Sequence, residues 1–83
     1  MNQTSLLDLA AAPPMSLCDR LEMFFRDRPE QWIDGRVLGT VAGAYAWRSR
    51  VSQLRRERGM QIANRQRRVD GYVVSEYRWQ RAE

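Results

Sequence analysis

The chain has 83 residues, enough for one small domain, and its 43% hydrophobic and 29% charged residues form an ordinary globular mixture. It holds one cysteine, Cys18, and no histidine. This composition excludes an internal disulfide, a Cys/His zinc site and a Ser-His-Asp triad. The acidic residues within 19–34 have no histidine, cysteine or glycine-rich loop as a partner, so we expect no paired-carboxylate site. We therefore expect no catalytic residues, no metal and no cofactor, and we do not expect an enzyme. Without a membrane-length apolar stretch or a secretory signal, the sequence predicts a soluble, cytoplasmic protein.

The positive charge is concentrated in the C-terminal half. All fourteen basic residues are arginine. Residues 1–43 hold four arginines against six acids, whereas residues 44–83 hold ten arginines against four acids. A pI near 10.2 with the charge in one half is typical of a protein that binds a polyanion.

The beginning of the chain divides into two parts. Residues 1–14, which end in two prolines, are predicted to be a flexible tail, and residues 15–80 a folded domain. A first helix is expected over about 16–28, because Ser16 is a good N-cap and Asp19 completes a capping box.

Two further helices follow. Asp34 is the predicted N-cap of a short helix over 35–42, on which the inward side chains are Val37, Leu38 and Val41. A third helix is expected over 44–58, ended by Gly59. Its spacing places one apolar stripe toward the core, formed by Ala44, Trp47, Val51 and Leu54.

After Gly59 the hydrophobic period changes from that of a helix to that of a strand. Asp70-Gly71 predicts a hairpin closed by a type I′ turn. A two-residue turn at this position pairs Ile62 with Trp79 at the base and Arg65 with Glu76 on the outside. The three tryptophans of the chain are predicted to be core residues, namely Trp32, Trp47 and Trp79.

Several segments together resemble small winged helix-turn-helix domain proteins of bacteriophages and mobile elements, over about residues 17–79. The segments that carry this resemblance are 32–38, 42–43, 47–55, 59–65, 70–71 and 75–77. The resemblance implies an α+β fold of three helices and a C-terminal hairpin, the wing. It also implies binding to double-stranded DNA with the third helix in the major groove.

Carried over to this sequence, the resemblance assigns two sets of DNA-binding residues. The reading positions on the third helix are Tyr45, Arg48, Ser49, Ser52, Gln53 and Arg56. The wing positions, expected to lie on the DNA backbone, are Arg65, Arg67 and Arg68.

Three functions remain open at this point. The first is a DNA-binding regulator, for example of transcription, or an accessory factor of a phage or mobile element. The second is a winged helix used as a protein-interaction module in a replication or packaging assembly, and the third is a non-specific DNA or RNA binder. We expect a monomer or weak homodimer. In the tail, Gln3, Ser5, Leu6 and Leu7 weakly resemble a peptide that docks on the bacterial sliding clamp.

Overall fold

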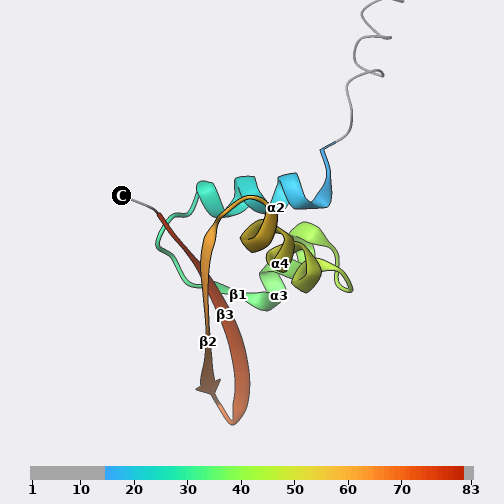
Figure 1. Ribbon diagram of the computed structural model, residues 1–83. Coiled ribbons are helices and arrows are strands. Elements are labelled where there is room, and N and C mark those ends of the chain that lie inside the picture. Colours follow the sequence, from blue (N-terminus) through green and yellow to red (C-terminus); the bar gives the residue numbers. More distant parts are fainter. Residues whose placement is uncertain (1–14, 82–83) are drawn as a thin grey trace, which may run out of the picture.

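The computed structural model describes residues 15–81, which form three helices and a three-stranded antiparallel sheet (Figure 1). In chain order the elements are α2 (Leu17–Arg26), β1 (Ile33–Asp34), α3 (Gly35–Ala42), α4 (Trp47–Glu57), β2 (Gln61–Val69) and β3 (Tyr72–Gln80). The predicted α+β class, with three helices and a C-terminal hairpin, is confirmed for these residues. The order of elements is consistent with a winged helix. Within this range no helix is long and apolar enough to cross a membrane.

Helix α2 begins with the predicted capping box. The Ser16 hydroxyl accepts a hydrogen bond from the Asp19 N–H, and the Asp19 carboxylate accepts one from the Ser16 N–H. The helix ends at Arg26, two residues earlier than predicted. A proline disfavours helical backbone in the residue before it, so Pro29 excludes Arg28 from the last turn.

Helix α3 has the predicted bounds and the predicted cap, since Asp34 Oδ1 accepts a 2.8 Å hydrogen bond from the Arg36 N–H. The prediction that Val37 points inward is wrong, because Val37 is 41% exposed. The buried side of α3 is instead formed by Gly35, Leu38 and Ala42.

Helix α4 begins at Trp47, three residues later than predicted, because residues 44–46 form a turn. Ala44 is therefore exposed and does not join the core. The predicted stripe is otherwise confirmed, as Trp47, Val51 and Leu54 are all buried. These three residues fix which side of α4 faces the solvent.

Ion pairs join the residue after the C-terminal end of α4, Arg58, to α2. Arg58 Nη1 lies 2.7 Å from Asp19 Oδ1 and 2.7 Å from Glu22 Oε1. Hydrogen bonds from Arg58 lower the pKa of both carboxyl groups, since they favour the ionised forms. Arg58 thus connects two helices that are far apart in sequence.

The hairpin has the predicted turn and register. Asp70 and Gly71 have φ values of 50° and 82°, as a type I′ turn requires. Strand β2 pairs with β3 so that Ile62 lies opposite Trp79 and Arg65 opposite Glu76. In Figure 1 the turn end of this hairpin extends away from the helices.

Strand β1 was not predicted. It pairs with the other side of β3, with Ile33 opposite Tyr77 and Asp34 opposite Glu76, so β3 is the central strand. Because side chains alternate along a strand, Ile33 faces the helices and Asp34 faces outward. This places Asp34 beside Glu76 on the outer face of the sheet.

Candidate nucleic-acid interface

Helix α4 presents a polar, cationic surface on the side away from the core. Four of the six predicted reading residues are exposed on it, namely Arg48, Ser49, Ser52 and Arg56. Since Trp47, Val51 and Leu54 are buried on the opposite side, this surface is held in a fixed orientation. A B-DNA major groove is wide enough to admit one α-helix, and arginine and serine side chains can contact its bases and phosphates.

The other two reading residues differ from the prediction. Tyr45 is fully exposed but lies in the turn before α4, so it is not a helix residue. Gln53 is partly buried, and its Nε2 donates a 3.0 Å hydrogen bond to Glu57 Oε1. In this conformation Gln53 is less accessible than the other four.

A further arginine of α4 fastens the helix to the sheet. Arg55 donates two hydrogen bonds to the Ile62 carbonyl, from Nε at 3.0 Å and Nη2 at 2.8 Å. This contact holds α4 against the beginning of β2. Arg55 is consequently a link between α4 and the hairpin.

A groove of about 370 Å³ separates the first turns of α3 and α4 from β3. Arg36 and Arg48 belong to its lining, together with Val73 and Ser75 of β3. The first turn of α4 therefore faces the hairpin across this groove. The two sets of predicted DNA-binding residues lie on neighbouring elements.

The predicted wing residues divide between the two faces of the hairpin. Side chains alternate along β2, so Arg65 and Arg67 share the outer face while Arg68 lies on the other. All three are exposed. Arg68 forms no ion pair with another described residue, whereas Arg65 and Arg67 both bind one carboxylate.

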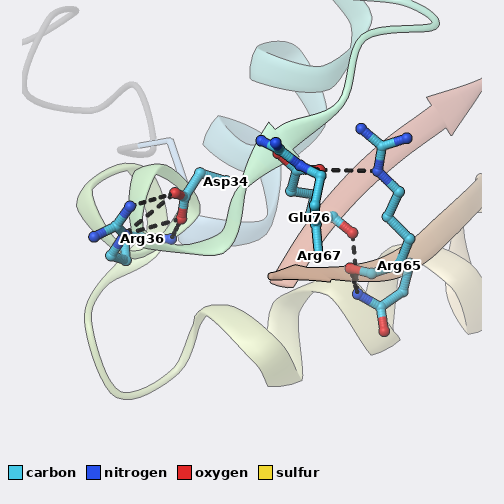
Figure 2. A network of polar contacts seen from close by, with 6 residues as sticks. Asp34, Arg36, Arg65, Arg67 and Glu76 are labelled. Atoms are coloured by element: carbon cyan, nitrogen blue, oxygen red, sulfur yellow. Dashed lines mark hydrogen bonds and ion pairs between the residues drawn. The ribbon is translucent and has the colours of Figure 1, made fainter. Parts of the chain in front are cut away.

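That carboxylate belongs to Glu76, and Figure 2 shows the network that it forms. Glu76 Oε1 accepts hydrogen bonds from Arg65 Nε at 2.8 Å and from Arg67 Nε at 3.3 Å, and Oε2 accepts one from Arg67 Nη2 at 3.1 Å. These bonds, first from Arg67 and then from Arg65, lower the pKa of Glu76. The same contact raises the pKa of Arg67.

Glu76 differs from its prediction in burial. The sequence predicts an outer charge pair of Arg65 and Glu76, but Glu76 is only 6% exposed. Two arginines cover it instead of one, and β1 lies along its other side. The prediction considered only the residue directly opposite, whereas a long side chain two positions along the same face, here Arg67, also reaches across the strands.

Trp32 is also placed differently from the prediction. It is not a core residue but is partly buried, with two guanidinium groups against its ring. Those of Arg65 and Arg78 lie 4.1 Å and 4.7 Å from its ring centroid. Guanidinium groups stack favourably on indole rings. The other two tryptophans, Trp47 and Trp79, are buried as predicted.

The outer face carries one more ion pair, beside the groove. Arg36 Nη2 lies 2.7 Å from Asp34 Oδ2. Hydrogen bonds from Arg36 lower the pKa of Asp34. Sequence reasoning missed the role of Arg36, although a basic residue two positions after an aspartate N-cap is a usable signal.

Comparison with known proteins gives one family. A protein-family model, the KpnI N-terminal domain, matches residues 18–80. The matched range includes α3, α4 and the whole hairpin, and therefore every predicted DNA-binding residue. Searches of curated proteins and of solved structures found no match.

The match changes two sequence-based expectations. The KpnI domain belongs to a restriction endonuclease family, so the prediction that this chain is not an enzyme is contradicted. That prediction rested on the missing histidines, the single cysteine and the expected lack of a paired-carboxylate site, which argue against particular active sites but not against membership of an enzyme family. The match indicates a DNA-related role, and it gives no support to a phage regulator family. The suggested clamp-docking residues of the tail, Gln3, Ser5, Leu6 and Leu7, lie outside the described residues.

Proposed function

Because this chain belongs to the KpnI N-terminal domain family, we propose that it recognises double-stranded DNA as a winged helix. In this proposal α4 enters the major groove and the β2–β3 hairpin lies against the sugar-phosphate backbone. The domain supplies DNA recognition within a family related to restriction endonucleases. Transcriptional regulation and a phage origin stay predictions from the sequence.

The exposed side of α4 is the observation that carries the proposal. Its residues combine arginines, which bind phosphate or the edge of guanine, with serines, which bind bases or backbone. Arg48, Ser49 and Ser52 are all exposed, and the buried Trp47 and Val51 keep the helix from rotating. Base discrimination requires donors and acceptors carried on a rigid element, and the packing of α4 against the core supports this role.

The charge of the C-terminal half supports the same proposal. Ten of the fourteen arginines lie in residues 44–83. Strand β2 of the hairpin beside α4 carries three of them, Arg65, Arg67 and Arg68. Because DNA carries closely spaced phosphates, arginines on two adjacent elements increase the affinity of a protein for DNA.

Binding to a random pool of duplexes at two salt concentrations tests the proposal. If about four to seven arginines contact phosphates, log K falls with log salt at a slope of roughly −4 to −6. Sequencing the retained duplexes measures specificity in the same experiment. The binding assay uses residues 1–83.

Two matched variants sharpen the test. Arg56→Gln removes one charge from the exposed side of α4, and Arg20→Gln removes one from an exposed position of α2. We expect the first to reduce duplex affinity and to make the salt slope shallower by about one, with little change for the second. Equal effects of both variants would indicate attraction by net charge alone. A wild-type chain that binds no duplex at low salt would exclude a DNA-binding function and favour the protein-interaction module.

A further inference from the structure

Within residues 15–81, Glu76 is the one charged residue that is buried. A buried carboxylate destabilises a fold unless hydrogen bonds and opposite charges compensate it. Here the compensation comes from two guanidinium groups that are themselves about half exposed, at 44% for the Arg65 side chain and 54% for that of Arg67. The carboxylate is fixed, and it fixes two side chains that reach the solvent.

We propose that Glu76 is a positioning residue, which holds Arg65 and Arg67 so that their remaining N–H groups bind phosphates of the DNA backbone. The inference rests on the proposed DNA-binding function. It adds a residue that does not itself touch DNA. In this proposal the outer face of the sheet binds the phosphodiester groups of DNA.

The geometry leaves donors for such a contact. Arg65 uses only Nε on Glu76 and keeps both terminal amino groups, whereas Arg67 uses Nε and Nη2 and keeps Nη1. A guanidinium carries five N–H donors. When a carboxylate binds one edge of the group, N–H donors on another edge remain available for a second anion. Figure 2 shows the side chains of Arg65 and Arg67 on either side of Glu76.

The indole of Trp32 restricts Arg65 further. The Arg65 guanidinium lies 4.1 Å from the Trp32 ring centroid while its Nε binds Glu76. Contacts on one face and one edge leave this long side chain little freedom. Side chains that are ordered before binding lose less entropy when they meet a ligand, and this raises affinity.

The outer face remains cationic after its internal pairs are formed. Four arginines and two carboxylates share it, namely Arg36, Arg65, Arg67, Arg78, Asp34 and Glu76. Arginine forks match the geometry of phosphate oxygens. The surplus of guanidinium groups therefore suits an anion.

A simple charge argument makes the opposite prediction for Glu76. If the carboxylate only reduced the positive potential, then Glu76→Gln would bind a polyanion more tightly, because the protein would lose a negative charge. If the carboxylate positions the two arginines, the same variant binds more weakly. The sign of the change separates the two roles.

The experiment compares duplex binding by wild type, Glu76→Gln and Asp70→Asn in the full chain. Asp70→Asn removes the same charge from the same hairpin, and asparagine tolerates the positive φ of this turn position. We expect Glu76→Gln to weaken binding about fivefold or more, with a salt slope shallower by up to about two. Asp70→Asn should bind as tightly as wild type or more tightly, with an unchanged slope.

A second variant keeps the inference testable if Glu76→Gln does not fold, which circular dichroism and thermal melting will reveal. Arg67→Lys retains both the charge and Glu76 but replaces the fork by a point charge. Weaker binding by Arg67→Lys, with Arg20→Lys on α2 unchanged, would support the positioning role. Unchanged affinity of Arg67→Lys would contradict it.

The outcomes distinguish this inference from the proposed function. If wild type binds duplex DNA and folded Glu76→Gln binds equally or more tightly, the positioning role is wrong while the DNA-binding function stands. If wild type binds no duplex, both are wrong. A double-mutant cycle completes the test, because Arg67→Gln should cost less affinity in the Glu76→Gln chain than in wild type.

Discussion

The indole of Trp47 packs edge-on against the ring of Tyr77, with ring centroids 5.3 Å apart and ring planes at 86°. Trp47 is the first residue of α4, and Tyr77 lies on the central strand β3. This T-shaped contact joins the exposed helix to the base of the hairpin. The relative placement of the two candidate DNA-binding elements therefore depends on this aromatic pair and on the hydrogen bonds from Arg55 to the Ile62 carbonyl.

Truncation of Trp47 should consequently destabilise the domain rather than alter a binding surface. We expect Trp47→Ala to lower the free energy of unfolding by ~3–5 kcal/mol, as other large aromatic truncations in cores do. Arg56→Ala, on the exposed side of the same helix, should change it by about 0.5 kcal/mol or less. Urea denaturation of both variants measures the difference, and a reversed order would show that the assigned orientation of α4 is wrong.

Gly35 should not tolerate a larger residue while Trp47 is present. A Cβ at position 35 would lie 2.8 Å from Cη2 of the buried Trp47 ring. We expect Gly35→Ala to destabilise the domain by about 1–3 kcal/mol, as overpacking does. Trp47→Phe removes the clashing atom, so Gly35→Ala should cost less in a Trp47→Phe chain than in wild type. Additive effects of the two substitutions in denaturation would contradict this contact.

Acid should weaken the link between α2 and α4. The pKa values of Asp19 and Glu22 are lowered in the folded protein, chiefly by hydrogen bonds from Arg58. Groups whose pKa falls on folding contribute stability above their unfolded pKa values, which are near 4, and this contribution is lost as pH decreases through the folded values. Thermal melting from pH 6 to pH 2 should show a decline in Tm that begins at about pH 5.

Arg58→Ala provides the control for this pH dependence. Without the guanidinium, Asp19 loses one hydrogen bond and Glu22 loses another. We expect a lower Tm at pH 6 and a smaller further decline toward pH 2 than in wild type. If the variant and wild type decline in parallel, other carboxyl groups account for the acid sensitivity.

Helix α4 should determine which sequence is bound, and the hairpin should affect all sequences alike. Ser49 lies on the exposed side of α4, so Ser49→Ala should change the preferred duplexes, with ~1–3 kcal/mol lost for each correct base contact. Arg68→Gln should weaken binding to every duplex and make the salt slope shallower by about one. Selection from a random pool measures both. A changed motif with Arg68→Gln and an unchanged motif with Ser49→Ala would show that the hairpin reads the sequence.

The sequence predicts the hairpin best, because two residues determine it. Asp70 and Gly71 specify the turn type, and the turn type specifies every pair along β2 and β3. The cap of α3 was likewise readable, because Asp34 binds a backbone N–H only two residues away. Local chemistry of this kind needs no knowledge of the tertiary fold.

The features that escaped prediction depend on contacts between distant segments. Strand β1 has two residues, too few for any periodicity, and its pairing with β3 crosses more than forty positions of the chain. That pairing places Trp32 beside Arg65 and Arg78 and helps to bury Glu76. Of the candidate site, the exposed arginines and serines of α4 were predictable, whereas the arginine network of the outer face was not.

The short length of β1 has a mechanical consequence. Strand β1 pairs only with Tyr77 and Glu76 of β3. From Ser75 to the turn at Asp70-Gly71, the sheet therefore consists of β2 and β3 alone. The hairpin is held at its base by the buried Ile62, Tyr77 and Trp79. At about 3.3 Å per residue, β2 extends roughly 13 Å past Arg65, where the three-stranded part ends. A rotation of this two-stranded end relative to the helices would displace Arg68, so in the proposed complex the hairpin would adjust to duplexes of different groove width while α4 stays in place.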